Sequence, residues 1–165
     1  MRPFLQLYLL VIAFATLGEV RADNLISARQ ISDELKPYGI HSTEFSAQKY
    51  EKPKYRWIKK EFLPFYKRYL QSSRAFYQSE GIDCDNFCVF FQSALFQQNV
   101  KSGNISKANS AVGVLYADVG RFLDVRHVLI LIRTDRGWMT VEGENGRVVP
   151  LKRYIRKNRV LKAVF

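Results

Sequence analysis

The segment HVLILIRTDRGWMTVE, residues 127–142, carries the clearest structural signal in this 165-residue chain. A run of branched apolar residues after His127 is followed by the turn signal Asp-Arg-Gly at 135–137, and then by a second apolar-rich stretch at 138–142. Short apolar runs separated by a glycine-containing turn are typical of an antiparallel β-hairpin. The segment therefore predicts two paired strands, with the end of the second beside the start of the first.

Two further runs rich in Val, Ile and Leu flank the hairpin, at 112–119 and 160–165. Upstream, apolar residues recur at helical spacing over 85–98. Helices followed by a run of antiparallel strands predict an α+β domain. Nearer the N-terminus we expect helical segments over 24–39 and 54–77, with an irregular polar stretch over 42–53.

The start of the chain has the pattern of an export signal. Arg2 gives a positive start, Phe4–Leu17 is apolar, and the segment Val-Arg-Ala at 20–22 ends on a small residue, as signal peptidase requires. The apolar run is short for a membrane span, and no second one follows it. We therefore expect residues 1–22 to be removed and residues 23–165 to form one domain, periplasmic or secreted from a bacterium, with no transmembrane segment.

The chain is strongly basic, with 26 Lys and Arg against 15 Asp and Glu and a formal net charge of +11. This balance favours anionic partners, such as nucleic acid, lipid head groups, cell-wall polymers or acidic proteins. Aromatic and basic residues over 54–77 could stack on single-stranded nucleic acid, but packing on a core explains the same pattern, so no specific nucleic acid is predicted. Six cations near the C-terminus are expected to bind an anionic surface or substrate: Lys152, Arg153, Arg156, Lys157, Arg159 and Lys162.

Two cysteines, Cys84 and Cys88, lie four residues apart at the start of the helical pattern. A disulfide at that spacing would need badly directed Cβ atoms, so both are expected to be free thiols, and two Cys with two distant His make no spaced metal-ligand set. Cys84 falls where a turn becomes a helix, and unpaired backbone N–H groups there favour a thiolate. Cys84 is therefore a candidate nucleophile, although a buried structural cysteine fits the position equally. Cys88 is expected to pack in the core.

A thiolate nucleophile needs a base, and the candidate is His127, because His41 lies in the polar N-terminal segment. The hairpin places Glu142 near His127. Its carboxylate is expected to accept the Nδ1–H of His127, which leaves Nε2 facing the sulfur of Cys84. The competing carboxylates are Glu144, Asp124 and Asp118.

Two of these stretches resemble a known family. Asp-Cys-Asp-Asn-Phe at 83–87 is similar to the Asp-Cys-Glu-Asp-Tyr nucleophile motif of the bacterial transglutaminase-like cysteine peptidases, and 127–137 resembles their His strand and its Arg-Thr-Asp-x-Gly turn. The interval from His127 to Glu142 is the family's interval from His to its orienting Asp. Gly-Trp at 137–138 resembles the Gly-Trp-x-x-Val-Asp pattern of the wider superfamily. The resemblance covers most of the chain after the export signal.

The resemblance implies a papain-like or transglutaminase-like core and an exported thiol hydrolase. Cys84, His127 and Glu142 would be its catalytic triad, and its substrate an amide bond of a protein or peptide, such as an anionic envelope protein. No cofactor is required, but acidic residues beside the Cys hold calcium in some members. This makes Asp83 and Asp85 candidate calcium ligands, although Glu, Gly and Asn replace the family's residues at positions 142, 143 and 86.

Two alternatives stay open. A cell-wall amidase related to the NlpC/P60 enzymes would also present Asp-Cys at a helix start and His on a following strand, but it fits the Arg-Thr-Asp-Arg-Gly-Trp stretch less well. A catalytically silent binding module would use the basic surface to hold an anionic partner. The reactivity of Cys84 discriminates between an enzyme and a binding module.

Overall fold

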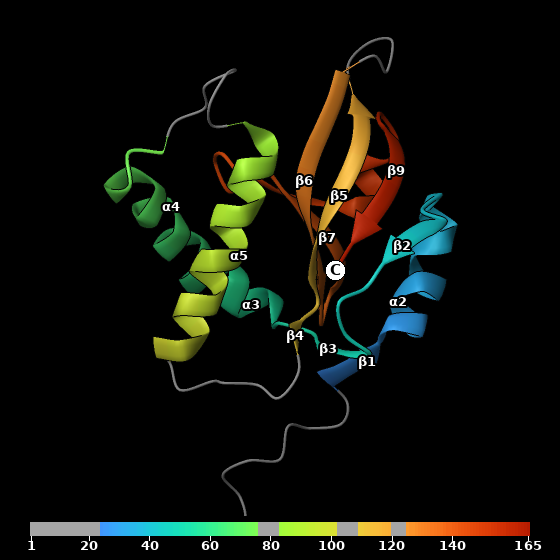
Figure 1. The fold of residues 1–165 in the computed structure, drawn as a ribbon, viewed down its shortest axis with the longest axis horizontal. Helices are drawn as coiled ribbons and strands as arrows, with labels where there is room; N and C mark the ends of the chain where they lie inside the picture. Colours follow the sequence, from blue (N-terminus) through green and yellow to red (C-terminus); the bar gives the residue numbers. More distant parts are fainter. Residues whose placement is uncertain (1–23, 76–82, 102–108, 120–124) are drawn as a thin grey trace, which may run out of the picture.

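The computed structural model describes residues 24–75, 83–101, 109–119 and 125–165 (Figure 1). The predicted export signal, residues 1–22, lies outside them. The described residues form two β-sheets with helices packed on them.

Six strands form the main sheet, in the order β2-β9-β5-β6-β7-β8. Neighbouring strands are antiparallel except β2 and β9, which are parallel. The predicted hairpin is the β6–β7 pair, in which Thr134 pairs with Gly137 across a tight turn. Gly137 has a φ of 105°, which residues with a Cβ rarely adopt. The strands are β2 (Ser42–Glu44), β5 (Val112–Val119), β6 (Val125–Thr134), β7 (Gly137–Val141), β8 (Val148–Pro150) and β9 (Arg159–Val164).

The N-terminal part differs from the sequence prediction. Its helix α2 (Ala28–Leu35) is shorter than expected and starts at a capping box in which Ser27 and Gln30 exchange hydrogen bonds. A short 3₁₀ turn follows at Lys36–Tyr38. The stretch 42–53 is not irregular, because it contains two strands, each only three residues long and paired with a strand distant in sequence. The second sheet has the order β1-β3-β4: Leu25–Ser27, Lys49–Glu51 and Asn109–Ser110.

The side chains of β6 alternate between two cores, which explains the unbroken apolar run in its sequence. Val128, Ile130 and Ile132 belong to one core, and Leu129 and Leu131 to the other. Figure 1 shows α4 and α5 on one side of the main sheet and α2 on the other. The remaining helices are α3 (Tyr55–Trp57), the π-helical segment η3 (Ile58–Phe62), α4 (Leu63–Ser72), α5 (Cys84–Lys101) and α6 (Leu151–Tyr154).

Aromatic packing holds α5 in place. The ring of Phe91 is fully buried and lies edge-on to Phe62 and Tyr66, with ring centroids 4.9 and 5.0 Å apart. Such pairs stabilise beyond their buried area. The predicted core positions of this helix are buried: Phe87, Phe91, Ala94 and Leu95. The helical pattern at 85–98 is thus confirmed.

Candidate functional site

Cys84 is the first residue of α5 and is half-buried against the core beneath that helix. The neighbouring side chains cap the helix: the amide oxygen of Asn86 accepts the backbone N–H of Asp83 at 3.1 Å, and the carboxylate of Asp85 accepts the N–H of Asn86 at 3.0 Å. The thiol therefore lies at a helix start, as predicted.

The hairpin brings His127 and Glu142 into contact. Nε2 of His127 lies 2.9 Å from Oε2 of Glu142, and the two side chains are 30 % and 18 % exposed. Arg147 donates from Nη2 to the other oxygen of Glu142 at 3.3 Å. The prediction that Nδ1 would meet the carboxylate is wrong. Glu142 directly follows the last β6–β7 pair, Ile130 with Val141, and its side chain reaches back along β6 to Nε2.

Packing of the next residue against α5 fixes the position of Glu142. A Cβ on Gly143 would lie 2.6 Å from the Cβ of Phe87, so no larger residue fits without a shift. The hydroxyl of Tyr66 lies 2.7 Å from the carbonyl oxygen of Gly143 and 3.2 Å from that of Phe87. These contacts tie α4, the first turn of α5 and the segment after β7 together. Cys84 and Glu142 are therefore presented at the same end of α5.

Electrostatics connect the same groups. Burial alone would raise the pKa of Glu142, but the hydrogen bond and charge of His127, together with Arg147, hold this pKa below its usual range. Burial raises the pKa of the Cys88 thiol to about 12, and the nearby Cys84, Asp85 and Glu142 add to the effect. The start of α5 thus combines a buried neutral thiol, a half-exposed thiol and an ionised carboxylate.

The two thiols are expected to differ in reactivity. In native protein, iodoacetamide at mildly alkaline pH should modify the half-exposed Cys84 and spare Cys88, which is 1 % exposed and hard to ionise. Peptide mass spectrometry identifies the modified residue. The Cys84→Ser variant is the matched control and should stay unlabelled until it is unfolded. Rapid labelling of Cys88 in that variant would contradict the packing described above.

Asp83 and Asp85 are the candidate calcium ligands. Their carboxylates share a hydrogen bond, which lowers the pKa of Asp83 and raises that of Asp85. Calcium takes about six to eight oxygen ligands. In the described part of the chain no group of three or more His, Cys, Asp or Glu side chains could hold a metal ion. The pair alone fits calcium poorly, and calcium binding stays a prediction.

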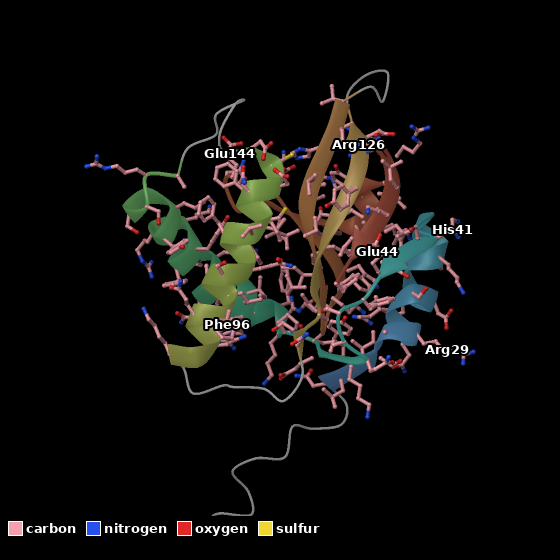
Figure 2. The ribbon with its side chains drawn as sticks, viewed as in Figure 1. Arg29, His41, Glu44, Phe96, Arg126 and Glu144 are labelled. Carbon is pink, nitrogen blue, oxygen red and sulfur yellow. The ribbon has the colours of Figure 1, made fainter. Side chains whose placement is uncertain are left out.

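The competing carboxylates lie elsewhere. Glu144 is exposed near the start of α5 (Figure 2) and lines a pocket of about 160 Å³ on α4. Asp118 is held by two arginines on neighbouring strands. Asp124 falls outside the described residues. Glu142 is therefore the carboxylate that contacts His127.

The predicted C-terminal cations divide into two groups. Four of them lie on α6 and in the turn after it, are exposed and form no ion pair with any other described residue. The other two are paired with carboxylates on β5 and β2. Between the first four lies Tyr154, whose buried hydroxyl has no hydrogen-bond partner among the described residues and whose pKa is raised by burial and by the charge of Glu142. The four form the α6 basic cluster: Lys152, Arg153, Arg156 and Lys157.

Sequence reasoning missed two sets of contacts. Arg147 holds Glu142, and Arg126 shares Asp118 with Arg159. The first contact belongs to the turn between β7 and β8, where the N–H of Glu142 donates to the carbonyl oxygen of Arg147. The second needs the pairing of β5 with β9, which joins segments far apart in sequence and has no local signal.

No protein-family model and no curated protein matches the chain. The fold resembles those of several solved structures. One is described as a PSL1a–E64 complex, with a TM-score of 0.62 and 16 % identity. Another is Polyporus squamosus lectin bound to the human-type influenza-binding epitope Neu5Acα2-6Galβ1-4GlcNAc, with a TM-score of 0.62 and 14 % identity. Each match covers 86 % of this chain and 50 % of the other, so this chain spans about half their length.

These likenesses contradict the predicted papain-like or transglutaminase-like core. They also overturn the predictions built on it, namely a thiol hydrolase, an enzyme of the cysteine peptidase class and an NlpC/P60-like amidase as its nearest rival. The physical reason is that the motifs are local. A cysteine at a helix start and a histidine beside a carboxylate fix a few side chains, but they do not determine how sheets and helices are arranged around them. The open alternative, a basic binding module, is not contradicted by these likenesses.

Several sequence predictions are not tested by these comparisons. The resemblance to the bacterial transglutaminase-like family, the roles of Cys84, His127 and Glu142, and export to the periplasm or medium stay predictions. A protein or peptide substrate finds no support in the similar structures, one of which holds a carbohydrate. Among the described helices, none is both long and apolar enough to cross a membrane.

Proposed function

We propose that this chain is a basic module that binds an anionic carbohydrate. The observation that carries this proposal is the α6 basic cluster, whose four exposed cations have no carboxylate partner among the described residues. Unpaired cations on a chain of net charge +11 create a positive potential that draws anions to this surface. Two of the four are arginines, whose planar forks match carboxylates in two-point hydrogen bonds.

Carbohydrate is the proposed ligand class because a lectin of similar fold has been solved with a glycan that ends in Neu5Ac. That sugar carries a carboxylate, which is ionised at neutral pH and complements the α6 basic cluster. The uncharged sugar hydroxyls can accept further hydrogen bonds from Lys and Arg side chains. A basic surface therefore suits an acidic glycan better than a neutral one.

Calorimetric titration with two glycans tests the proposal. The sialylated trisaccharide Neu5Acα2-6Galβ1-4GlcNAc should bind, and the disaccharide Galβ1-4GlcNAc, which lacks the acid, should bind at least about tenfold more weakly. Affinity for the trisaccharide should also fall between about 0.05 M and about 0.5 M salt, because exposed charges are screened over shorter distances at higher ionic strength. Equal affinity for both glycans, or no binding of either, would refute the proposal.

A further inference from the structure

Asp118 in β5 lies between two arginines on the neighbouring strands. In register, it faces Arg126 of β6 on one side and Arg159 of β9 on the other. Nε of Arg126 donates to Oδ1 of Asp118 at 3.0 Å, and Arg159 donates to Oδ2 from Nε at 3.0 Å and also from Nη2. These three residues form a row across three adjacent strands, which we name the Arg–Asp–Arg row.

The carboxylate of this row is buried, and its two guanidinium groups are exposed to solvent. The side chain of Asp118 is 7 % exposed, whereas those of Arg126 and Arg159 are 65 % and 64 % exposed. The hydrogen bond from Arg159, with that from Arg126, outweighs burial and holds the pKa of Asp118 below its usual range, so this carboxylate stays ionised at neutral pH. Figure 2 shows Arg126 near the end of the sheet at which α5 also begins.

The row keeps a surplus of positive charge and of hydrogen-bond donors. Two guanidinium groups and one carboxylate leave one net positive charge. Asp118 takes one N–H group of Arg126 and two of Arg159, so most of the N–H groups on both forks engage no other described residue. Because Asp118 already holds both forks, less side-chain entropy is lost when a ligand binds them.

We propose that the Arg–Asp–Arg row is the subsite for the acid group of the ligand. Its chemistry suits a carboxylate, accepted by the outward N–H groups of Arg126 and Arg159 together. This inference rests on the proposed function and identifies the acid group as the part of the glycan that the protein recognises. Arg159 follows Lys157 of the α6 basic cluster by two residues, so the row extends that cluster along the chain towards the centre of the main sheet.

The test compares an acid with its neutral ester. The probes are the α-methyl glycoside of N-acetylneuraminic acid and the methyl ester of the same compound, which differ only in the charge of the acid group. Wild-type protein should bind the acid about tenfold more tightly, as expected for charge-assisted hydrogen bonds. Arg126→Gln and Arg159→Gln should each reduce that ratio to about two or less. Arg68→Gln, which removes an exposed arginine from α4, is the matched control and should leave the ratio unchanged.

Two lysine variants keep the test valid where a glutamine variant fails to fold. Arg126→Lys and Arg159→Lys retain a charge beside Asp118 but lose the planar fork, so they should lower the acid-to-ester ratio about threefold. A wild-type ratio that persists in all four arginine variants would overturn the subsite and leave the proposed function standing.

Binding of neither glycoside by wild-type protein would refute the proposed function instead. The row is then tested alone with sulfate, by following the Nε–H signals of Arg126 and Arg159 in an NMR titration. Saturable shifts at both signals would support an anion site. Their absence would overturn it.

Discussion

Replacement of Phe91 by alanine is expected to be the most destabilising change in the described core, at about 3–5 kcal/mol. The buried ring fills the space between α4 and α5, and its removal leaves a cavity beside Phe62 and Tyr66. Urea unfolding followed by tryptophan fluorescence measures the effect, because Trp57 stacks on Phe62 at 5.6 Å and reports on this core. The urea concentration at which half of the protein is unfolded should fall, while the slope of the unfolding free energy against urea concentration stays constant.

Phe96 provides a matched control on the same helix. Its side chain is 71 % exposed, so Phe96→Ala should change stability by no more than about 0.5 kcal/mol. The loss of unfolding free energy in Phe91→Leu should lie between those of the two alanine variants, because the leucine side chain fills part of the cavity. Similar losses for Phe91→Ala and Phe96→Ala would mean that α5 does not pack on η3 and α4 through the face described here.

Neutralisation of the α6 basic cluster is expected to have the largest effect on binding. A fourfold variant with glutamine at Lys152, Arg153, Arg156 and Lys157 should bind the sialylated trisaccharide about 30-fold more weakly. Each of the four exposed cations contributes about 0.5 kcal/mol through attraction of the carboxylate and hydrogen bonds to sugar hydroxyls, so four together give about 2 kcal/mol. The side chains are exposed, so the melting temperature should change little.

An equal change of net charge elsewhere is the control. Glutamine at Lys59, Lys60, Lys67 and Arg68 removes four exposed cations from η3 and α4. That variant should keep most of the affinity, with a loss of about threefold or less from reduced long-range attraction. If both variants lose affinity equally, the ligand senses only net charge, and the α6 basic cluster is not a binding site.

The sequence was most informative where the structural signal is local. The turn at 135–137 and the apolar runs on either side of it specify the β6–β7 hairpin, and the helical spacing of buried residues specifies α5. Contact between His127 and Glu142 also follows from the hairpin register. The strands β1, β2 and β3 were missed, because three residues show no period and their partners are distant in sequence.

The overall architecture and the ring nitrogen of His127 lay beyond sequence reasoning. Motifs around Cys84 and His127 suggested a papain-like core, but such motifs do not record how sheets and helices pack, and the likeness to solved structures contradicts that core. The choice of Nε2 over Nδ1 depends on side-chain angles, which no sequence pattern records. The Arg–Asp–Arg row needs the β5–β9 register, which no motif encodes.

NMR chemical-shift mapping with the sialylated trisaccharide on isotope-labelled protein shows directly whether the α6 basic cluster and the surface beside it bind an acidic glycan. The largest saturable shifts should fall on residues 151–159 and on Arg126, and the disaccharide without Neu5Ac should cause much smaller shifts. Largest shifts on α4, or no saturable shifts with the trisaccharide, would contradict this prediction.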